Sequence, residues 1–194
     1  MRCFKSLFIL LAIAYSALLT SCGGGGGAGG GAGELKTVYL VPSISISRLE
    51  SDVNTGTDCS VSPPIPGTYA TDTVDVTISS NLYPNITSGK YVSVDSATIT
   101  YTGANASGVA HPLPTDYLSI TGATIAPGSN VSISVPVAKD ILKYDLVNRY
   151  GLQLCSAQYY EYYVTITFDC LEIGTDKRTT VTARLNVAFA DRAS

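Results

Sequence analysis

An all-β fold is predicted for most of this chain by three observations. Val, Ile, Thr and Tyr, all frequent in strands, recur in short runs between residues 37 and 190. Apolar and polar residues alternate within the runs, as in DTVDVTIS, where Val74, Val76 and Ile78 would share one face. Gly, Pro, Asn and Asp separate the runs and favour turns. Sheets buried on one side give this pattern.

Seven strands are expected from these runs. They cover Thr37–Ser47, Thr71–Ser80, Tyr91–Thr102, Tyr117–Ala123, Asn130–Val137, Gln158–Leu171 and Arg178–Ala190. The stretch VAKDILKYDLVNRYG breaks the alternation, because Ile141, Leu142 and Leu146 follow a helical spacing and Gly151 can end a helix. We therefore expect one short helix between strands five and six.

Seven strands with a long connection after the fifth are typical of an immunoglobulin-like β-sandwich. The segment VTITFDCLEIGTDKRTTVTARLNVAFAD, residues 164–191, resembles the closing hairpin of bacterial immunoglobulin-like domains. This resemblance implies such a sandwich for residues 35–194. It implies no activity, because the fold carries many unrelated functions.

The N-terminal residues have the features of a secretion signal. Arg2 and Lys5 precede an apolar run from Leu7 to Leu19, which is too short to cross a bilayer as a helix. The following residues, Leu19-Thr20-Ser21-Cys22, resemble the lipobox of bacterial lipoproteins. The resemblance implies cleavage after residue 21 and a diacylglycerol on the Cys22 sulfur, with two or three acyl chains as a stable membrane anchor.

A glycine-rich segment follows Cys22, and residues 23–33 are all Gly or Ala. Such residues bury little side-chain surface, so residues 22–34 are expected to form a flexible tether. Gly23 stands where the lipoprotein resemblance places an aspartate in proteins kept at the inner membrane. We therefore expect an extracytoplasmic lipoprotein, held at the outer membrane if the cell has two membranes.

Charge and motifs argue against nucleic-acid binding and catalysis. Without residues 1–21 the chain keeps 10 of its 12 basic residues against 15 acidic ones, a net charge of −5, and no basic stripe is left to follow phosphates.

His111 is the only histidine, and it lies in a Pro-rich segment expected to be an exposed loop. No HExxH, CxxC, P-loop or GxSxG motif occurs. We expect no enzyme activity and no cofactor.

A single segment offers candidate metal ligands. In DVNTGTD, oxygen-bearing side chains at alternate positions could converge on Ca²⁺, namely those of Asp52, Asn54 and Asp58. The match to a calcium loop is only half complete, because Gly56 and Pro63 stand where further ligands belong. The same residues are also good turn formers, so no metal is assigned.

Three cysteines remain after Cys3 is removed and Cys22 is lipidated. Cys155 and Cys170 would lie at opposite ends of strand six, nearly 40 Å apart, whereas a disulfide needs Cα atoms within about 7 Å. The first and fifth connections of a seven-stranded sandwich lie at the same end. We therefore predict a Cys59–Cys155 disulfide and a free Cys170, as in an oxidising compartment.

Tyrosine is the residue type that suggests a binding surface. In QYYEYYVTITF, alternation sends Tyr160 and Tyr162 into the core and leaves Tyr159 and Tyr163 outside, on either side of Glu161. Exposed tyrosines can simply favour a strand, but they also present rigid amphipathic area to a partner. Our hypothesis is a recognition patch formed by these three outward residues and facing away from the tether.

Two classes of function stay open. The first is a structural or protein-binding module of the cell envelope, from which an accessory subunit of an envelope complex would be indistinguishable. The second is a carbohydrate-binding module, favoured by 13 tyrosines and disfavoured by the absence of tryptophan.

Overall fold

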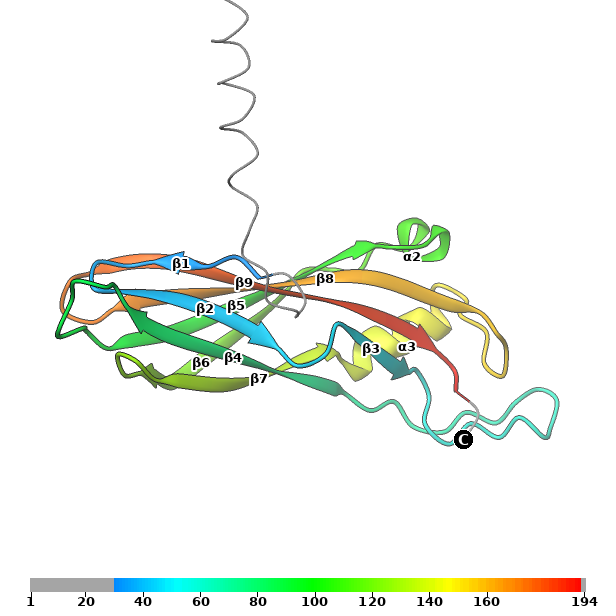
Figure 1. The fold of residues 1–194 in the computed structure, drawn as a ribbon. Coiled ribbons are helices and arrows are strands. Elements are labelled where there is room, and N and C mark those ends of the chain that lie inside the picture. The colour runs from blue at the N-terminus through cyan, green and yellow to red at the C-terminus, as the bar shows by residue number, and fades with distance from the viewer. Residues whose placement is uncertain (1–29, 193–194) are drawn as a thin grey trace, which may run out of the picture.

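The computed structural model describes residues 30–192, which form two packed β-sheets with two short helices (Figure 1). The elements are β1 (Gly33–Glu34), β2 (Val38–Ile44), β3 (Arg48–Asp52), β4 (Asp72–Leu82), β5 (Val92–Gly103), α2 (Ala106–Ala110), β6 (Asp116–Ile125), β7 (Asn130–Ala138), α3 (Asp140–Asn148), β8 (Tyr159–Glu172) and β9 (Lys177–Ala190). The expected all-β sandwich is confirmed. The predicted signal peptide and Cys22 lie outside these residues.

The two sheets have different sizes. One has the order β1-β2-β4-β7 and the other has the order β3-β9-β8-β5-β6. Neighbouring strands are antiparallel except for β3, which runs parallel to β9. The chain therefore changes sheets between β2 and β3.

The core lies between the sheets, and its composition follows the predicted alternation. The inward residues of β8 are all buried, namely Tyr160, Tyr162, Val164, Ile166 and Phe168. They join a cluster that includes Val74, Val76 and Ile78 of β4. Burial of a Val, Ile or Phe side chain contributes about 1.5–3 kcal/mol to folding, so this double row accounts for much of the stability.

The expected number of seven strands is too low for the described part of the chain. The predicted strand Thr37–Ser47 ends early, since β2 stops at Ile44 and the chain crosses to the other sheet as β3. A single alternating run cannot reveal such a change of sheet. The two-residue strand β1 lies within the expected tether and raises the count to nine.

The expected helix is present as α3, but its buried face differs from the prediction. Leu142 and Leu146 are buried, whereas Ile141 is 58% exposed. Lys143 takes the place of Ile141 in the interior. The helix α2 was not expected, because its five residues, ASGVA, carry no clear apolar period. Neither helix of this part of the chain has the length and apolarity to span a membrane.

The predicted tether is wrong at its C-terminal boundary, because residues 30–34 belong to the sandwich. Gly31 exchanges two backbone hydrogen bonds with Thr182 of β9. Two residues later, Gly33 pairs with Leu40 of β2 in the other sheet. This glycine strap, residues 30–34, therefore joins the two sheets along one edge.

Glu172 holds the strap's continuation in place. Its buried carboxylate accepts hydrogen bonds from the backbone nitrogens of Lys36 (3.2 Å) and Thr37 (2.8 Å) and from the hydroxyls of Thr37 and Thr175. Burial raises the pKa of Glu172, but these hydrogen bonds lower it by more, so its pKa lies below the usual value.

Candidate recognition surface

The three outward residues predicted from the sequence form a row on the outer face of β8. Tyr159 is 44% exposed and Tyr163 is 55% exposed, with the half-buried Glu161 between them. In the register of β8 with β9, Tyr159 lies opposite Ala190, Glu161 lies opposite Ala188 and Tyr163 lies opposite Asn186. Because two of these partners are alanines, the sheet surface beside Tyr159 is low.

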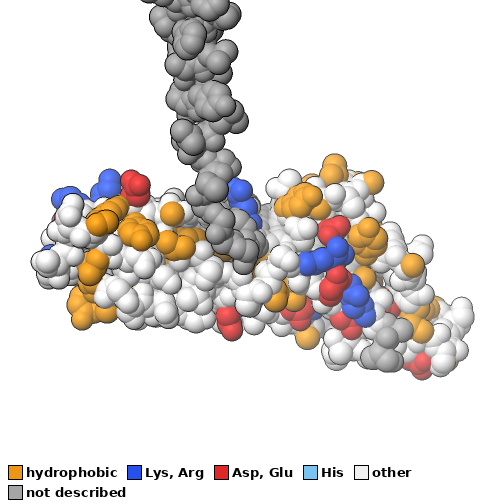
Figure 2. Space-filling model, in the orientation of Figure 1, with side chains coloured by type: hydrophobic (Ala, Val, Ile, Leu, Met, Phe, Trp, Pro, Cys, Tyr) orange, Lys and Arg blue, Asp and Glu red, His pale blue; other side chains and the backbone are white. Residues whose placement is uncertain are grey.

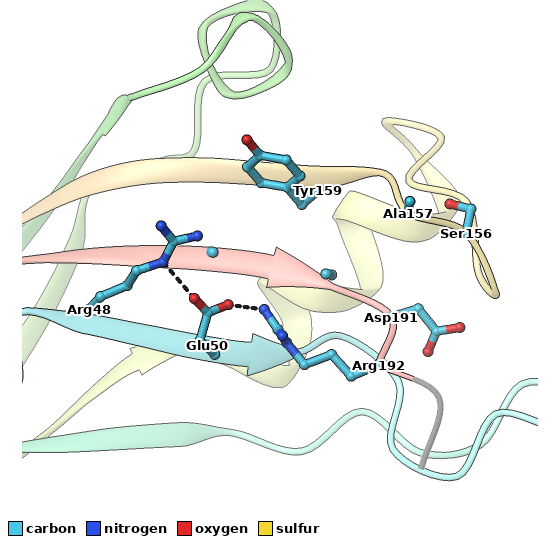
Figure 3. Close-up of a pocket in the computed structure, with 9 residues that line it drawn as sticks. Arg48, Glu50, Ser156, Ala157, Tyr159, Asp191 and Arg192 are labelled. Carbon is cyan, nitrogen blue, oxygen red and sulfur yellow. Dashed lines mark hydrogen bonds and ion pairs between the residues drawn. The ribbon is translucent and has the colours of Figure 1, made fainter.

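A hollow of about 400 Å³ occupies this low surface (Figure 3). It is lined by Arg48, Glu50, Ser156, Ala157, Tyr159, Ala188, Ala190, Asp191 and Arg192. Strand β3 supplies one wall, and the start of β8 supplies the other. The parallel pairing of β3 with β9 places Glu50 opposite Ala188, so the charged wall rises directly beside the alanine floor.

Three of the four charged side chains that line this first hollow, Arg48, Glu50 and Arg192, form ion pairs with one another or with Glu161. Arg48 contacts Glu50 (2.6 Å) and Glu161 (3.2 Å), and Arg192 contacts the other oxygen of Glu50. Figure 2 shows the resulting alternation of basic and acidic side chains over the region of β3 and β9. Exposed pairs of this kind contribute little stability, so their main effect is to fix the orientation of Glu161 and Glu50.

A second hollow, of about 530 Å³, lies next to Tyr163. It is lined by Ser47, Thr102, Tyr163, Val164, Thr165, Arg184, Leu185 and Asn186. The exposed ring of Tyr163 is surrounded there by hydroxyl, amide and guanidinium groups, and no carboxylate lines this second hollow. Arg184 has no ion pair among residues 30–192. The two hollows therefore differ in charge, and they lie at opposite ends of the β8 row, beside Tyr159 and Tyr163.

Asn105, which sequence reasoning missed, holds the start of this row. Its Nδ2 donates to the Tyr159 carbonyl (3.0 Å), and its Oδ1 accepts from the Glu161 nitrogen (3.2 Å) and the Gly108 nitrogen (2.8 Å). The last of these bonds caps the N-terminus of α2. One side chain thus attaches α2 to the free edge of β8, where β5 has ended.

A disulfide joins two loops at the Tyr159 end of the sandwich. Cys59 and Cys155 are bonded, with Cα atoms 5.6 Å apart, and Cys170 is a buried free thiol. This is the pairing predicted from the strand order. Burial, with nearby Asp169 and Asp95, raises the pKa of Cys170 to about 12. The thiol is therefore protonated and shielded at neutral pH.

The three calcium candidates accept hydrogen bonds from their own turns, and Asp52 and Asn54 also accept from more distant segments. Asp52 accepts from the nitrogens of Asn54 (3.3 Å) and Arg192 (3.1 Å), and Asp58 accepts from the Ser60 nitrogen (2.9 Å). Asn54 is buried, and its Oδ1 accepts from Gly67 and Thr57. These contacts follow the turn-forming alternative. In the described chain, the group of acidic and sulfur atoms close enough for a metal is Cys59, Cys155 and Asp191, whose sulfurs are engaged in the disulfide.

His111 is half-buried rather than an exposed loop residue as expected. Its ring stacks on Tyr150 and Tyr160, with centroids 5.1 and 5.2 Å away, and its carbonyl accepts from the Tyr162 hydroxyl (2.7 Å). A ring stacked on two others has a packing role. The prolines around His111 predicted an extended loop but gave no sign that the loop folds back over β8.

The β3 and C-terminal residues of the first hollow carry no motif in the sequence. Arg48, Glu50 and Arg192 reach the Tyr row only because the chain changes sheets after β2, which could not be predicted from alternation. No family model matches the chain, and no curated protein matches its sequence.

Proposed function

We propose that this protein is a lipid-anchored, extracytoplasmic binding module with an immunoglobulin-like sandwich, without enzyme activity, and that it holds a protein partner at the outer face of β8. Cys22 would carry the lipid, at the outer membrane of a cell with two membranes. The recognition surface is defined as Tyr159, Glu161 and Tyr163 with the two hollows beside them.

The strand order supports the immunoglobulin-like part of the proposal. The order β9-β8-β5 corresponds to G-F-C of that fold, β6 then takes the position of C′, and β2-β4-β7 corresponds to A-B-E. A tyrosine near the start of strand F characteristically bonds back to an upstream carbonyl, and Tyr160 donates to the Tyr150 carbonyl (2.7 Å). The arrangement departs from that fold in lacking a D strand between β6 and β7.

Cysteine usage and the N-terminal pattern support the location. A disulfide that closes 96 residues of sequence separation persists in oxidising compartments and not in a reducing cytosol. The order of basic residues, apolar run, small residues and cysteine agrees with export and lipidation.

The position of the two outward tyrosines carries the recognition proposal. Each is about half exposed on a regular strand, and each borders its own hollow, with a charge-paired Glu161 between them. Tyrosines in such positions bury large rigid areas at small entropic cost, which is why they are enriched at interface hot spots.

Cross-linking on intact cells, with the captured molecules identified, tests this proposal. The Tyr159→Ser/Tyr163→Ser variant should keep the melting temperature of the parent, since surface changes usually cost under about 0.5 kcal/mol, and should capture the partner at least about tenfold less. Tyr117→Ser is the matched control, because Tyr117 is 74% exposed on β6 of the same sheet and borders neither hollow. Equal capture by the double variant and the parent would refute the recognition surface.

A carbohydrate ligand is the second candidate, and the lining of the second hollow favours it. One exposed ring surrounded by hydroxyl, amide and guanidinium groups can stack on a sugar and bond its hydroxyls. In this case the cross-linking would recover a glycan in place of a protein, and Tyr163→Ser alone would abolish capture while Tyr159→Ser would not.

A further inference from the structure

One end of the sandwich carries lysines beside exposed apolar side chains, and we call it the lysine end: Lys36, Lys90, Lys177, Tyr91 and Ile173. Tyr91 is 55% exposed and Ile173 is 46% exposed. A hydrogen bond from the Ile173 nitrogen to the Tyr91 carbonyl (2.8 Å) keeps these two residues together. The lysines are exposed, and none has an ion pair within residues 30–192.

Hydrogen bonds around Glu172 connect the segments that meet at this end. Lys177 lies opposite Glu172 in the backbone register of the β8–β9 hairpin. The backbone nitrogen of Lys36 donates to the Glu172 carboxylate. The backbone nitrogen of Lys90 donates to the Thr37 hydroxyl (2.9 Å), and this hydroxyl donates to the Glu172 carboxylate. The backbone of Lys36 is thus bonded to the Glu172 carboxylate directly, that of Lys90 is bonded to it through Thr37, and Lys177 lies opposite Glu172 on β9.

We propose that the lysine end rests on the phospholipid surface to which Cys22 would be anchored, an inference that depends on the proposed lipid anchor. A tyrosine ring and an aliphatic side chain can lie at headgroup depth, and lysines beside them can reach lipid phosphates. Figure 2 shows basic and apolar side chains gathered at the end of the sandwich where the β8–β9 hairpin lies.

The contact between the lysine end and the phospholipid surface is weak by itself, but it only has to orient a domain that the acyl chains already hold at the membrane. Glu34 and Asp176 are exposed at the same end and offset two of the three lysine charges. The acyl chains supply the membrane affinity, and they hold the domain at a high local concentration next to the bilayer. Under these conditions a small preference for one contact is enough to set the orientation.

The length of the tether permits this orientation. Seven residues lie between Cys22 and Gly30, and the eight steps from one Cα to the next can span at most about 28 Å. Gly31 lies beside Thr182, and Thr182 is five residues, or about 17 Å, along β9 from Lys177 at the lysine end. The chain can therefore run from the strap back to the plane of the lysine end and enter the bilayer there.

The orientation would also direct the recognition surface. Tyr159 and Glu172 are the two ends of the 14-residue strand β8, about 43 Å apart. With the lysine end on the bilayer, the first hollow and the disulfide point away from the membrane. The strap begins beside β9, in the same sheet as the tyrosines. The distance along β8 between Glu172 and Tyr159 is therefore what keeps the first hollow away from the lipid.

The test uses the full lipidated protein in vesicles of phosphatidylethanolamine and phosphatidylglycerol. A fluorophore is attached through Lys90→Cys or through Ile141→Cys, which is exposed on α3, and spin-labelled lipid headgroups serve as the quencher. Buried Cys170 does not compete for the label. We expect quenching at position 90 and none at position 141. The Tyr91→Ser/Ile173→Ser variant should lose the quenching at 90, and the control Val109→Ser, at a residue 67% exposed beside β8, should keep it.

Flotation of the same vesicles measures the anchor separately. Protein that floats and is quenched equally at both positions, or at neither, would overturn the orientation and leave the anchor standing. Protein that fails to float would overturn the anchor and the orientation with it.

Discussion

Gly33 packs so tightly on Val181 that a Cβ atom on Gly33 would lie 2.7 Å from the Val181 Cγ1 and 2.9 Å from the Thr180 carbonyl oxygen. Gly33 belongs to β1 of one sheet, and Val181 belongs to β9 of the other. The close approach explains why this part of the glycine-rich segment must be glycine: only a residue without a side chain lets the strap lie over the seam between the sheets.

Replacing Gly33 with alanine should therefore destabilise the domain. Backbone and a branched side chain must move to admit the methyl group, which costs about 1–3 kcal/mol as overpacking. Gly31→Ala is the matched control, because its Cβ would meet its nearest atom at 3.7 Å, an ordinary contact. Chemical denaturation of both variants measures the difference, and equal midpoints would show that the strap contributes no stability.

Glu172 should make the fold sensitive to acid. Burial raises its pKa, but the hydrogen bonds from Thr175, Thr37 and Lys36 lower the pKa by more, so its folded value lies below the unfolded 4.5. The charged form is thus favoured by folding, and its stabilisation is complete above pH 4.5 and is lost as the pH falls through the folded pKa.

Glu172→Gln should consequently unfold more easily than the parent at neutral pH and lose less stability between about pH 6 and pH 3. Its melting temperature over this range is the measurement. Glu34→Gln, an exposed neighbour in the strap, is the control and should follow the parent. A Gln variant with the parent's acid dependence would exclude Glu172 as the responsible group.

The strands of this fold were predictable because each carries its own alternating pattern. The expected ranges for the six strands from β4 to β9 agree with the observed strands within two residues. In β8, alternation alone separated the buried Tyr160 and Tyr162 from the exposed Tyr159 and Tyr163. The disulfide followed from strand order, because only one pair of loop cysteines could meet.

Features that depend on contacts between distant segments could not be predicted in this way. Gly33 has no side chain, so its close fit against Val181 leaves no mark on hydrophobic patterning. Arg48 and Arg192 reach Tyr159 only through a parallel pairing after a change of sheet. Asn105 looks like any turn residue until its amide is seen to bridge α2 and β8.

Cys170 should be unreactive in the folded protein. Its thiol is fully buried, and burial, with Asp169 and Asp95 nearby, raises its pKa to about 12. A thiol reagent such as dithionitrobenzoate at about pH 8 should therefore find no free thiol until denaturant is added, and then one per chain. The Cys170→Ala variant is the control and should release no colour in either condition. Rapid reaction of the native protein would show that β8 opens at this position.

Removing the disulfide should lower stability without changing the strand pattern. The Cys59→Ser/Cys155→Ser variant frees a long loop, and we expect a loss of about 2–4 kcal/mol. Denaturation of the parent with and without reductant should give the same difference. The variant itself should be insensitive to reductant, and a reductant effect on it would point to another cause.

Replacing Lys143 of α3 should lower the stability of the domain, although lysine is normally exposed and its replacement then has little effect. Its Nζ is buried and donates to the Asp52 carbonyl (2.8 Å) and to the Asp72 carboxylate (2.9 Å), which also accepts from Ser51 (2.7 Å). Lys143→Met keeps the length of the side chain but leaves these acceptors short of a donor, at a cost of about 1–3 kcal/mol. Lys90→Met, at an exposed lysine, should cost nothing measurable. Denaturation midpoints decide, and equal midpoints for the two variants would mean that α3 is held by its leucines alone.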